Sequence, residues 1–168
     1  KHRAALVMVD NSTTENSLAI IVPVFDDWES LSLLIEHLAK ELPVRREHTH
    51  LVLVDDGSVV SPPDLSPLIR EIGFSATLLT LSRNVGSQRA IAVGLCHAVR
   101  ALAPERIVIM DADGEDRPED VRLLLTALQE NVNAIVVAQR RRRSEGIQFR
   151  LFYHFYKALF ALLTGISI

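Results

Sequence analysis

Aspartate residues gather in three short segments, and each segment directly follows a run of apolar residues. The segments are Asp26-Asp27, Asp55-Asp56 and residues 111–116. Ligands of an open α/β sheet bind beyond the carboxyl ends of its strands, so these carboxylates would meet at one edge. Like charges brought together destabilise a fold unless a cation or hydrogen-bond donors offset them. The pattern therefore predicts either a cation or a set of hydrogen-bond donors at that edge.

Asp111 and Asp113 have the spacing of a pair that could bind one divalent metal ion. They lie two residues apart at a predicted strand end, where both side chains can point to one side and leave open positions on the metal. Oxygen ligands favour Mg²⁺ or Mn²⁺, which also accept phosphate oxygens. An Asp-Gly pair after a strand is often only a turn, but the position at the sheet edge favours a metal site over a solvated turn.

The sequence contains neither of the two common glycine-rich phosphate cradles, GxxxxGK[ST] and GxGxxG. A diphosphate would therefore have to be neutralised by a metal ion and by basic side chains. Arg83 follows the third predicted strand and Arg140 follows the fifth, so both can reach the same edge. The run 140–143 has two other interpretations, a solvated basic patch or a contact with an anionic membrane surface.

The elements that must position these residues are short apolar runs that alternate with segments of helical period. We expect strands at residues 18–24, 50–55, 77–81, 106–110 and 134–138. Helical spacing marks residues 31–42, 65–72, 90–102 and 118–128, with Asp26 or Asp27 as the N-cap of the first helix and Cys96 as a core residue of the third. This alternation predicts an α/β, Rossmann-like fold, with a mostly parallel sheet and helices on both faces.

The composition excludes several classes of protein. The 168 residues include 18 Lys and Arg against 21 Asp and Glu, a net charge of −3, which disfavours nucleic acid as a partner. The single cysteine cannot form an internal disulfide, and zinc-type spacings are absent, which favours a reducing, cytoplasmic compartment. No run of about 18 uncharged apolar residues is available to span a bilayer.

Four segments occur in the order seen in family 2 inverting glycosyltransferases. They are residues 22–27 (VPVFDD), 53–58 (LVDDGS), 81–86 (LSRNVG) and 110–119 (MDADGEDRPE). From about residue 18 onward the chain resembles the polyprenyl-phosphate branch of that family, the dolichol-phosphate mannose synthases and bactoprenol glucosyltransferases. The resemblance implies a GT-A fold, a UDP- or GDP-sugar donor, Mg²⁺ or Mn²⁺ as cofactor, a polyprenyl phosphate acceptor and a role at the cell envelope.

The resemblance also implies roles for individual residues. In chain order they are Pro23, Phe25 and Asp27 in the nucleoside pocket, Asp56 at the base, Asp111 and Ala112 beside the ribose and diphosphate, Asp113 at the metal, and Arg140 at the diphosphate. Asp111 and Asp113 would carry catalysis, and Glu115 would join Asp113 at the metal. Arg83 is expected to bind the donor as well.

Three short segments depart from the usual pattern of the family. Asp26-Asp27 replace the usual Asn-Glu, Arg117-Pro118 replace paired prolines, and residues 114–116 (GED) replace Leu-Gln-Asp. Glu115 would thereby replace a neutral metal ligand with a charged one, which would tighten metal binding or alter its preference.

The implied reaction is a single displacement at the anomeric carbon with inversion, and the metal would neutralise the departing nucleoside diphosphate. A lipid phosphate acceptor is already ionised, whereas a sugar hydroxyl would need a base, for which Asp116 is the nearby candidate. Two other functions stay open, a sugar nucleotidyltransferase and a catalytically silent domain that binds a nucleotide sugar or a partner protein. The first would normally carry a Gly-rich, basic loop where this chain has residues 25–28 (FDDW).

We expect three segments along the chain. They are an N-terminal extension over residues 1–17, a nucleotide-sugar-binding domain over 18–146, and an amphipathic helix over 147–168. Five of the nine aromatic residues lie between 149 and 157, which is typical of a helix at a membrane interface, although a core helix is the alternative. The expected location is cytoplasmic, and an interfacial helix would add contact with the inner face of the membrane.

Overall fold

The computed structural model describes residues 3–7, 17–43, 48–130 and 134–138. The chain divides into two units, residues 1–136 and residues 137–168, and all the elements below belong to the first. The predicted boundary between residues 146 and 147, and the predicted helix after it, lie outside the described residues.

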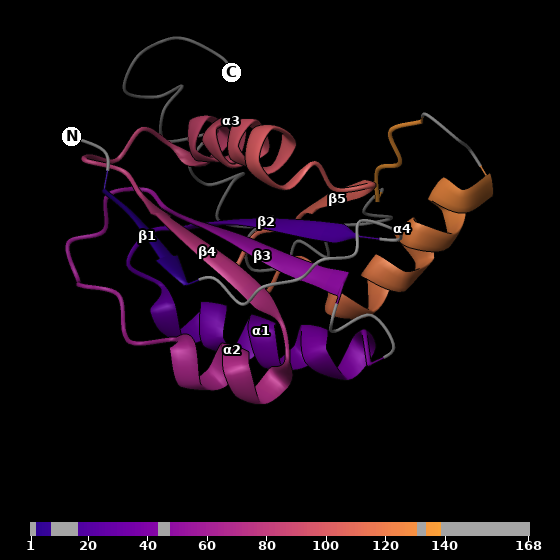
Figure 1. The fold of residues 1–168 in the computed structure, drawn as a ribbon, viewed down its shortest axis with the longest axis horizontal. Helices are drawn as coiled ribbons and strands as arrows, with labels where there is room; N and C mark the ends of the chain where they lie inside the picture. Colours follow the sequence, from indigo (N-terminus) through magenta and orange to yellow (C-terminus); the bar gives the residue numbers. More distant parts are fainter. Residues whose placement is uncertain (1–2, 8–16, 44–47, 131–133, 139–168) are drawn as a thin grey trace, which may run out of the picture. The chain divides into compact units, whose positions relative to one another are not determined.

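A five-stranded sheet forms the centre of the first unit, with the strand order β1-β4-β3-β2-β5 (Figure 1). The strands are β1 (Arg3–Val7), β2 (Leu18–Val24), β3 (Thr49–Asp55), β4 (Ser75–Thr80) and β5 (Arg106–Ile109). Strands β2 to β5 are parallel, and β1 lies antiparallel to β4 at one edge of the sheet. The mostly parallel sheet predicted from the sequence is confirmed.

The register of the parallel strands brings their carboxyl ends to the same level. Val24 at the end of β2 pairs with Asp55 of β3, and Asp55 pairs with Thr80 of β4. Backbone hydrogen bonds continue the alignment into the loops, since the Asp56 N–H donates to the Val24 carbonyl (2.8 Å) and the Leu81 N–H to the Asp55 carbonyl (2.9 Å). The connections that follow these three strands therefore begin side by side.

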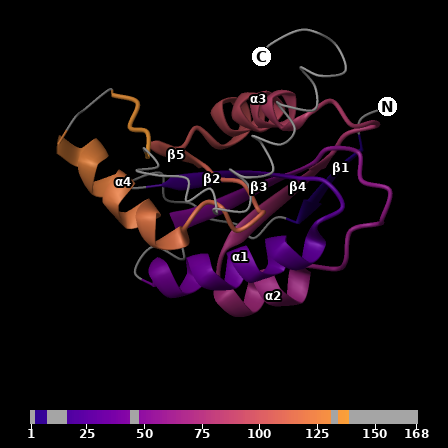
Figure 2. The ribbon, with the colours of Figure 1, turned by 180° about the vertical axis from the view of Figure 1, so that it is seen from behind.

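Helices cover both faces of the sheet (Figure 2). The helices are α1 (Trp28–Glu41), α2 (Ser66–Ile72), α3 (Ser87–His97), which continues into the π-helical turn η2 (Ala98–Leu102), and α4 (Pro118–Glu130). α1 and α2 lie on one face and α3 on the other, and α4 packs beside α1. The predicted presence of helices on both faces is thus confirmed. Within the described ranges, no helix combines the length and the apolar character needed to cross a membrane.

The two faces of the sheet carry separate cores, because successive side chains of a strand point to opposite faces. Leu18, Ile20 and the other even-numbered residues of β2 pack toward α1, whereas Ala19 and Ile21 pack toward α3. Every residue of β2 is buried, as its unbroken apolar run indicates. α3 lies so close to the sheet that a Cβ at Gly94 would be 2.6 Å from Cγ2 of Ile21.

Two expectations from the sequence are wrong, and one strand was not predicted. Residues 134–138 form no strand, and the 93 % exposed Ile135 indicates that this apolar run has no strand partner in the described part of the chain. Cys96 is exposed, because Ala90, Gly94 and Ala98 are the positions of that helical segment that face the sheet. Residues 3–7 form β1, although no element was assigned to them.

Candidate functional site

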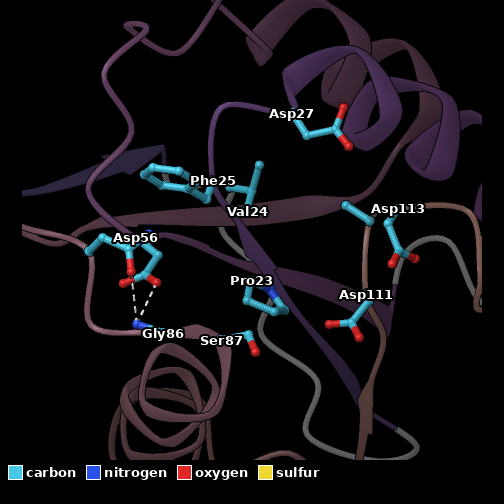
Figure 3. Close-up of a pocket in the computed structure, with 11 residues that line it drawn as sticks. Pro23, Val24, Phe25, Asp27, Asp56, Gly86, Ser87, Asp111 and Asp113 are labelled. Atoms are coloured by element: carbon cyan, nitrogen blue, oxygen red, sulfur yellow. Dashed lines mark hydrogen bonds between the residues drawn. The ribbon is translucent and has the colours of Figure 1, made fainter. Parts of the chain in front are cut away.

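A cavity of about 320 Å³ opens at the carboxyl edge of the sheet (Figure 3). It is lined by Pro23, Val24, Phe25, Asp27, Asp56, Asn84, Gly86, Ser87, Asp111, Ala112 and Asp113. These residues come from the end of β2, the loop after β3, the start of α3 and the segment after β5. The level strand ends explain why segments so far apart in sequence meet here.

Most of the residues predicted for the site lie in this lining. Those that do are Pro23, Phe25, Asp27, Asp56, Asp111, Ala112 and Asp113. Arg83 and Glu115 are exposed residues outside the lining, and Arg140 lies outside the described residues. The structure thus brings together the aspartates of all three acidic segments, whereas Arg83, the one predicted arginine within the described residues, is outside the lining.

The connection between β4 and α3 contributes to the site in a way that the sequence analysis missed. Asn84, Gly86 and Ser87 line the cavity where α3 begins, and Val24 was also not predicted. A signal was available, because Gly86 separates a predicted strand from a helical segment and so marks a helix start at the carboxyl edge. Gly86 has a φ of +91°, in the left-handed region that favours glycine.

Asp56 ties the loop after β3 to the start of α3. Its side chain is only 3 % exposed, and its two carboxylate oxygens accept the N–H groups of Val85 (2.7 Å) and Gly86 (2.8 Å, dashed in Figure 3). Hydrogen bonds to an ionised acceptor are the stronger kind. Because a carboxylate has about four lone-pair sites, Asp56 can still accept a bond from a ligand in the cavity.

Gly57 allows these two loops to approach each other. A Cβ at this position would lie 2.3 Å from the carbonyl carbon of Arg83 and 2.6 Å from the nitrogen of Asn84, and the φ of Gly57 is +74°. Any larger residue would therefore push apart the loops that Asp56 joins.

Asp27 and Phe25 lie at the turn between β2 and α1. Asp27 is the N-cap of α1, and its Oδ1 accepts the Ser30 N–H at 3.3 Å, which confirms one of the two predicted caps. Phe25 is 46 % exposed, so a large part of its ring is available to a ligand. Figure 3 shows Phe25 and Asp56 at one end of the cavity and Asp111 and Asp113 at the other.

The segment after β5 folds into a tight loop that orients its two cavity-lining carboxylates. The Asp111 N–H donates to Oδ2 of Asp116 (2.9 Å), and Oδ1 of Asp113 accepts the Glu115 N–H (2.8 Å). Ala112 is buried between them. Asp116, the candidate base, is outside the lining and supports the backbone of Asp111 instead.

The lining carries a strong negative charge. Among the described residues of the lining, four are aspartates (Asp27, Asp56, Asp111 and Asp113), and none is a lysine or arginine. An anionic ligand such as a diphosphate would be repelled by these charges unless a cation accompanied it. The lining is therefore suited either to a cation or to an anion bound together with one.

The oxygen donors at the Asp111–Asp113 end fit a hard divalent ion. Within the described residues, no group of three or more His, Cys, Asp or Glu side chains is arranged to hold a metal. A metal at this end would therefore have one or two protein carboxylates and take its other ligands from a bound phosphate and water. Mg²⁺ commonly binds in this way, whereas a structural zinc site needs a complete protein cage.

Comparison with known proteins agrees with the fold. The sequence model of the family described as "Glycosyl transferase family 2" matches residues 19–164. Among solved structures, the mannosyltransferase PcManGT from Pyrobaculum calidifontis, in complex with GDP-Man and Mn²⁺, matches with a TM-score of 0.50 and 22 % identity, over 83 % of this chain and 38 % of that one. The architecture described above is thus that of a GT-A glycosyltransferase fold.

Two curated relatives give the level of sequence similarity. The undecaprenyl-phosphate 4-deoxy-4-formamido-L-arabinose transferase of Proteus mirabilis is 29 % identical over 136 residues, which is 80 % of this chain and 40 % of the relative. The dodecaprenyl-phosphate galacturonate synthase of Rhizobium johnstonii is 27 % identical over 134 residues, 79 % of this chain and 38 % of the relative. The chain thus spans about two fifths of their length, and it belongs to glycosyl transferase family 2.

Proposed function

We propose that the chain binds a nucleoside diphosphate sugar in the cavity at the carboxyl edge, and that the protein transfers the sugar to a polyprenyl phosphate with inversion at the anomeric carbon. The observation that carries this proposal is the convergence of Phe25 and Asp56 at one end of a single cavity with Asp111 and Asp113 at the other. The first pair suits a nucleoside, and the second suits a diphosphate with its metal.

The nucleoside would lie at the Phe25 end. The exposed ring of Phe25 offers a face on which a base can stack, and Asp56 has lone pairs left to accept an N–H of the base. Asp27, at the start of α1, is in position to accept a ribose hydroxyl. Uracil and guanine both carry a ring N–H, so UDP- and GDP-sugars are the donors to test.

The diphosphate would lie at the Asp113 end, with Mg²⁺ or Mn²⁺ between it and the protein. Asp113 would hold the metal together with the predicted ligand Glu115, and Asp111 would lie beside the diphosphate. When bound, the metal would neutralise the charge that develops on the departing nucleoside diphosphate. The N–H groups at the start of α3, beside Gly86 and Ser87, add a second source of positive potential. Arg140 remains a proposed contact of the diphosphate.

A polyprenyl phosphate is the acceptor that we propose. Its phosphate is ionised at neutral pH and needs no strong base to become a nucleophile. Asp116, the candidate base for a sugar hydroxyl, lies outside the lining and accepts the N–H of Asp111. The two relatives named above are described as acting on prenyl phosphates. Such an acceptor would place the reaction at the inner face of a membrane.

The proposal is tested by titrating the chain with UDP- and GDP-sugars, with and without Mn²⁺ or Mg²⁺. At least one donor should bind only when the metal is present. Asp113→Asn should abolish this metal-dependent binding. Asp120→Asn is the matched control, because Asp120 lies on α4 outside the cavity lining. Failure of every nucleotide sugar to bind in the presence of metal would refute the proposal. Release of pyrophosphate from a nucleoside triphosphate would instead favour a sugar nucleotidyltransferase.

A further inference from the structure

Asp26 has an unusual backbone conformation beside the cavity. Its φ is +55°, a left-handed value that an L-residue other than glycine seldom adopts. It lies between Phe25 and Asp27, which both line the cavity, but Asp26 is exposed and does not line it. The backbone conformation of Asp26 therefore affects how Phe25 and Asp27 face the cavity.

Hydrogen bonds from a distant loop hold Asp26 in this conformation. Its backbone N–H donates to Oγ of Ser58 (2.9 Å), and its Oδ1 accepts the N–H of Val60 (2.8 Å). The indole N–H of Trp28 donates to the carbonyl of Val60 (3.1 Å), which makes a third bond between the same two segments. Ser58 is fixed in turn, because its N–H donates to Oδ1 of Asp55 at the end of β3 (2.9 Å).

These bonds make the β2–α1 turn and the loop after β3 into one unit. The partners are separated by 32 to 34 residues, so the contact is tertiary rather than a local turn. Two side chains of this segment bond to the backbone of Val60, the indole of Trp28 and the acceptor oxygen of Asp26. Without it, the left-handed residue would lose the bond that offsets its strain, and Phe25 would be free to leave the cavity.

We propose that Asp26 is a positioning residue of the donor site, which sets the places of Phe25 and Asp27 without contacting the donor. This inference rests on the proposed function, because it assigns Asp26 to the nucleoside end of that site. The proposed role requires a residue at position 26 that has a short side chain with an acceptor oxygen and that tolerates a positive φ. Asn meets both conditions, whereas Ala meets neither. The negative charge is not required, because Asp26 is exposed and bonded to a neutral N–H.

The test compares Asp26→Ala, Asp26→Asn and wild type for binding of UDP and GDP in the presence of Mn²⁺. Asp26→Ala should weaken nucleotide binding about tenfold, and Asp26→Asn should stay within about twofold of wild type. Asp64→Ala is the matched control, because it removes an exposed carboxylate that accepts the Ser66 N–H (3.0 Å) farther along the same loop. This control should leave binding unchanged.

Fluorescence of Trp28, the only tryptophan of the chain, separates local loosening from unfolding. In Asp26→Ala the emission should change because the bond to Val60 weakens, while the thermal midpoint stays above the assay temperature. Equal nucleotide binding by Asp26→Ala and wild type would refute the positioning role alone, as would an Asp26→Asn variant as weak as Asp26→Ala. Absence of nucleotide binding by the wild type would refute the donor site itself, and the role of Asp26 with it.

Discussion

Replacing Asp56 with Asn should destabilise the fold, although the two side chains have nearly the same shape. The buried carboxylate accepts the N–H groups of Val85 and Gly86 at 2.7 and 2.8 Å. Asn keeps one acceptor oxygen, but its NH₂ group must then face the second N–H donor. The variant loses one charge-assisted hydrogen bond, which contributes about 1.5–3 kcal/mol, and sets its NH₂ group against a partly buried N–H. A small movement of the loop can offset part of this destabilisation. We therefore expect the free energy of unfolding to fall by about 2–4 kcal/mol.

Urea unfolding followed by circular dichroism measures this loss. With a slope of about 2 kcal/mol per molar urea, the midpoint should fall by about 1–2 M. Asp64→Asn is the matched control, because Asp64 is exposed and bonds to the neighbouring Ser66 rather than to a distant segment, so the unfolding free energy should change by less than about 0.5 kcal/mol. If Asp56→Asn unfolds at the same urea concentration as the control, the two hydrogen bonds do not hold the start of α3.

Three further changes test other parts of the structure. Gly94→Ala should lower the unfolding free energy by about 1–2 kcal/mol in urea, because its methyl group would crowd Ile21 and the better helix propensity of Ala offsets only part of that; an unchanged midpoint would mean that α3 can move away from the sheet. Burial, together with nearby His97, lowers the pKa of His50 from 6.5 to about 4. The unfolded chain therefore binds the proton first, so stability should fall by about 1–2 kcal/mol between pH 6.5 and 4, after allowance for the partly exposed ring; urea titrations of wild type and His50→Gln should show a smaller pH dependence in the variant. Removing divalent ions with EDTA should abolish the rise in thermal midpoint that a nucleotide sugar causes, and excess Mn²⁺ should restore it; a rise that persists in EDTA would contradict a metal at Asp113.

The sequence predicted the part of the site that depends on individual strands. Each acidic segment follows an apolar run, and parallel strands have their carboxyl ends at one edge, so Asp56, Asp111 and Asp113 were expected to converge. The helices were also predictable, because their apolar residues recur at helical spacing. The N-cap of α1 could be predicted only as one of two adjacent aspartates, because the choice between them depends on the φ of Asp26.

Features that depend on contacts between distant segments were not predictable in this way. Asn84 and Ser87 enter the lining because Asp56 bonds the backbone 29 and 30 residues further along. Residues 3–7 become a strand only through pairing with β4, and residues 134–138 remain outside the sheet although their composition is typical of a strand. In each case the partner, rather than the local pattern, determines the outcome. Cys96 is a related case. The helix that contains it was predicted correctly, but the face of that helix that packs against the sheet was not.

The bond network around Asp56 and Ser58 has a consequence for how tightly a small molecule can be held. The turn after β2, the loop after β3 and the start of α3 are already joined to one another by hydrogen bonds between backbone N–H groups and side-chain oxygens. Much of the entropy cost of ordering these segments is therefore incurred when the chain folds, and not when a ligand binds. In a preorganised site of this kind, more of the interaction energy is available to distinguish one ligand from another.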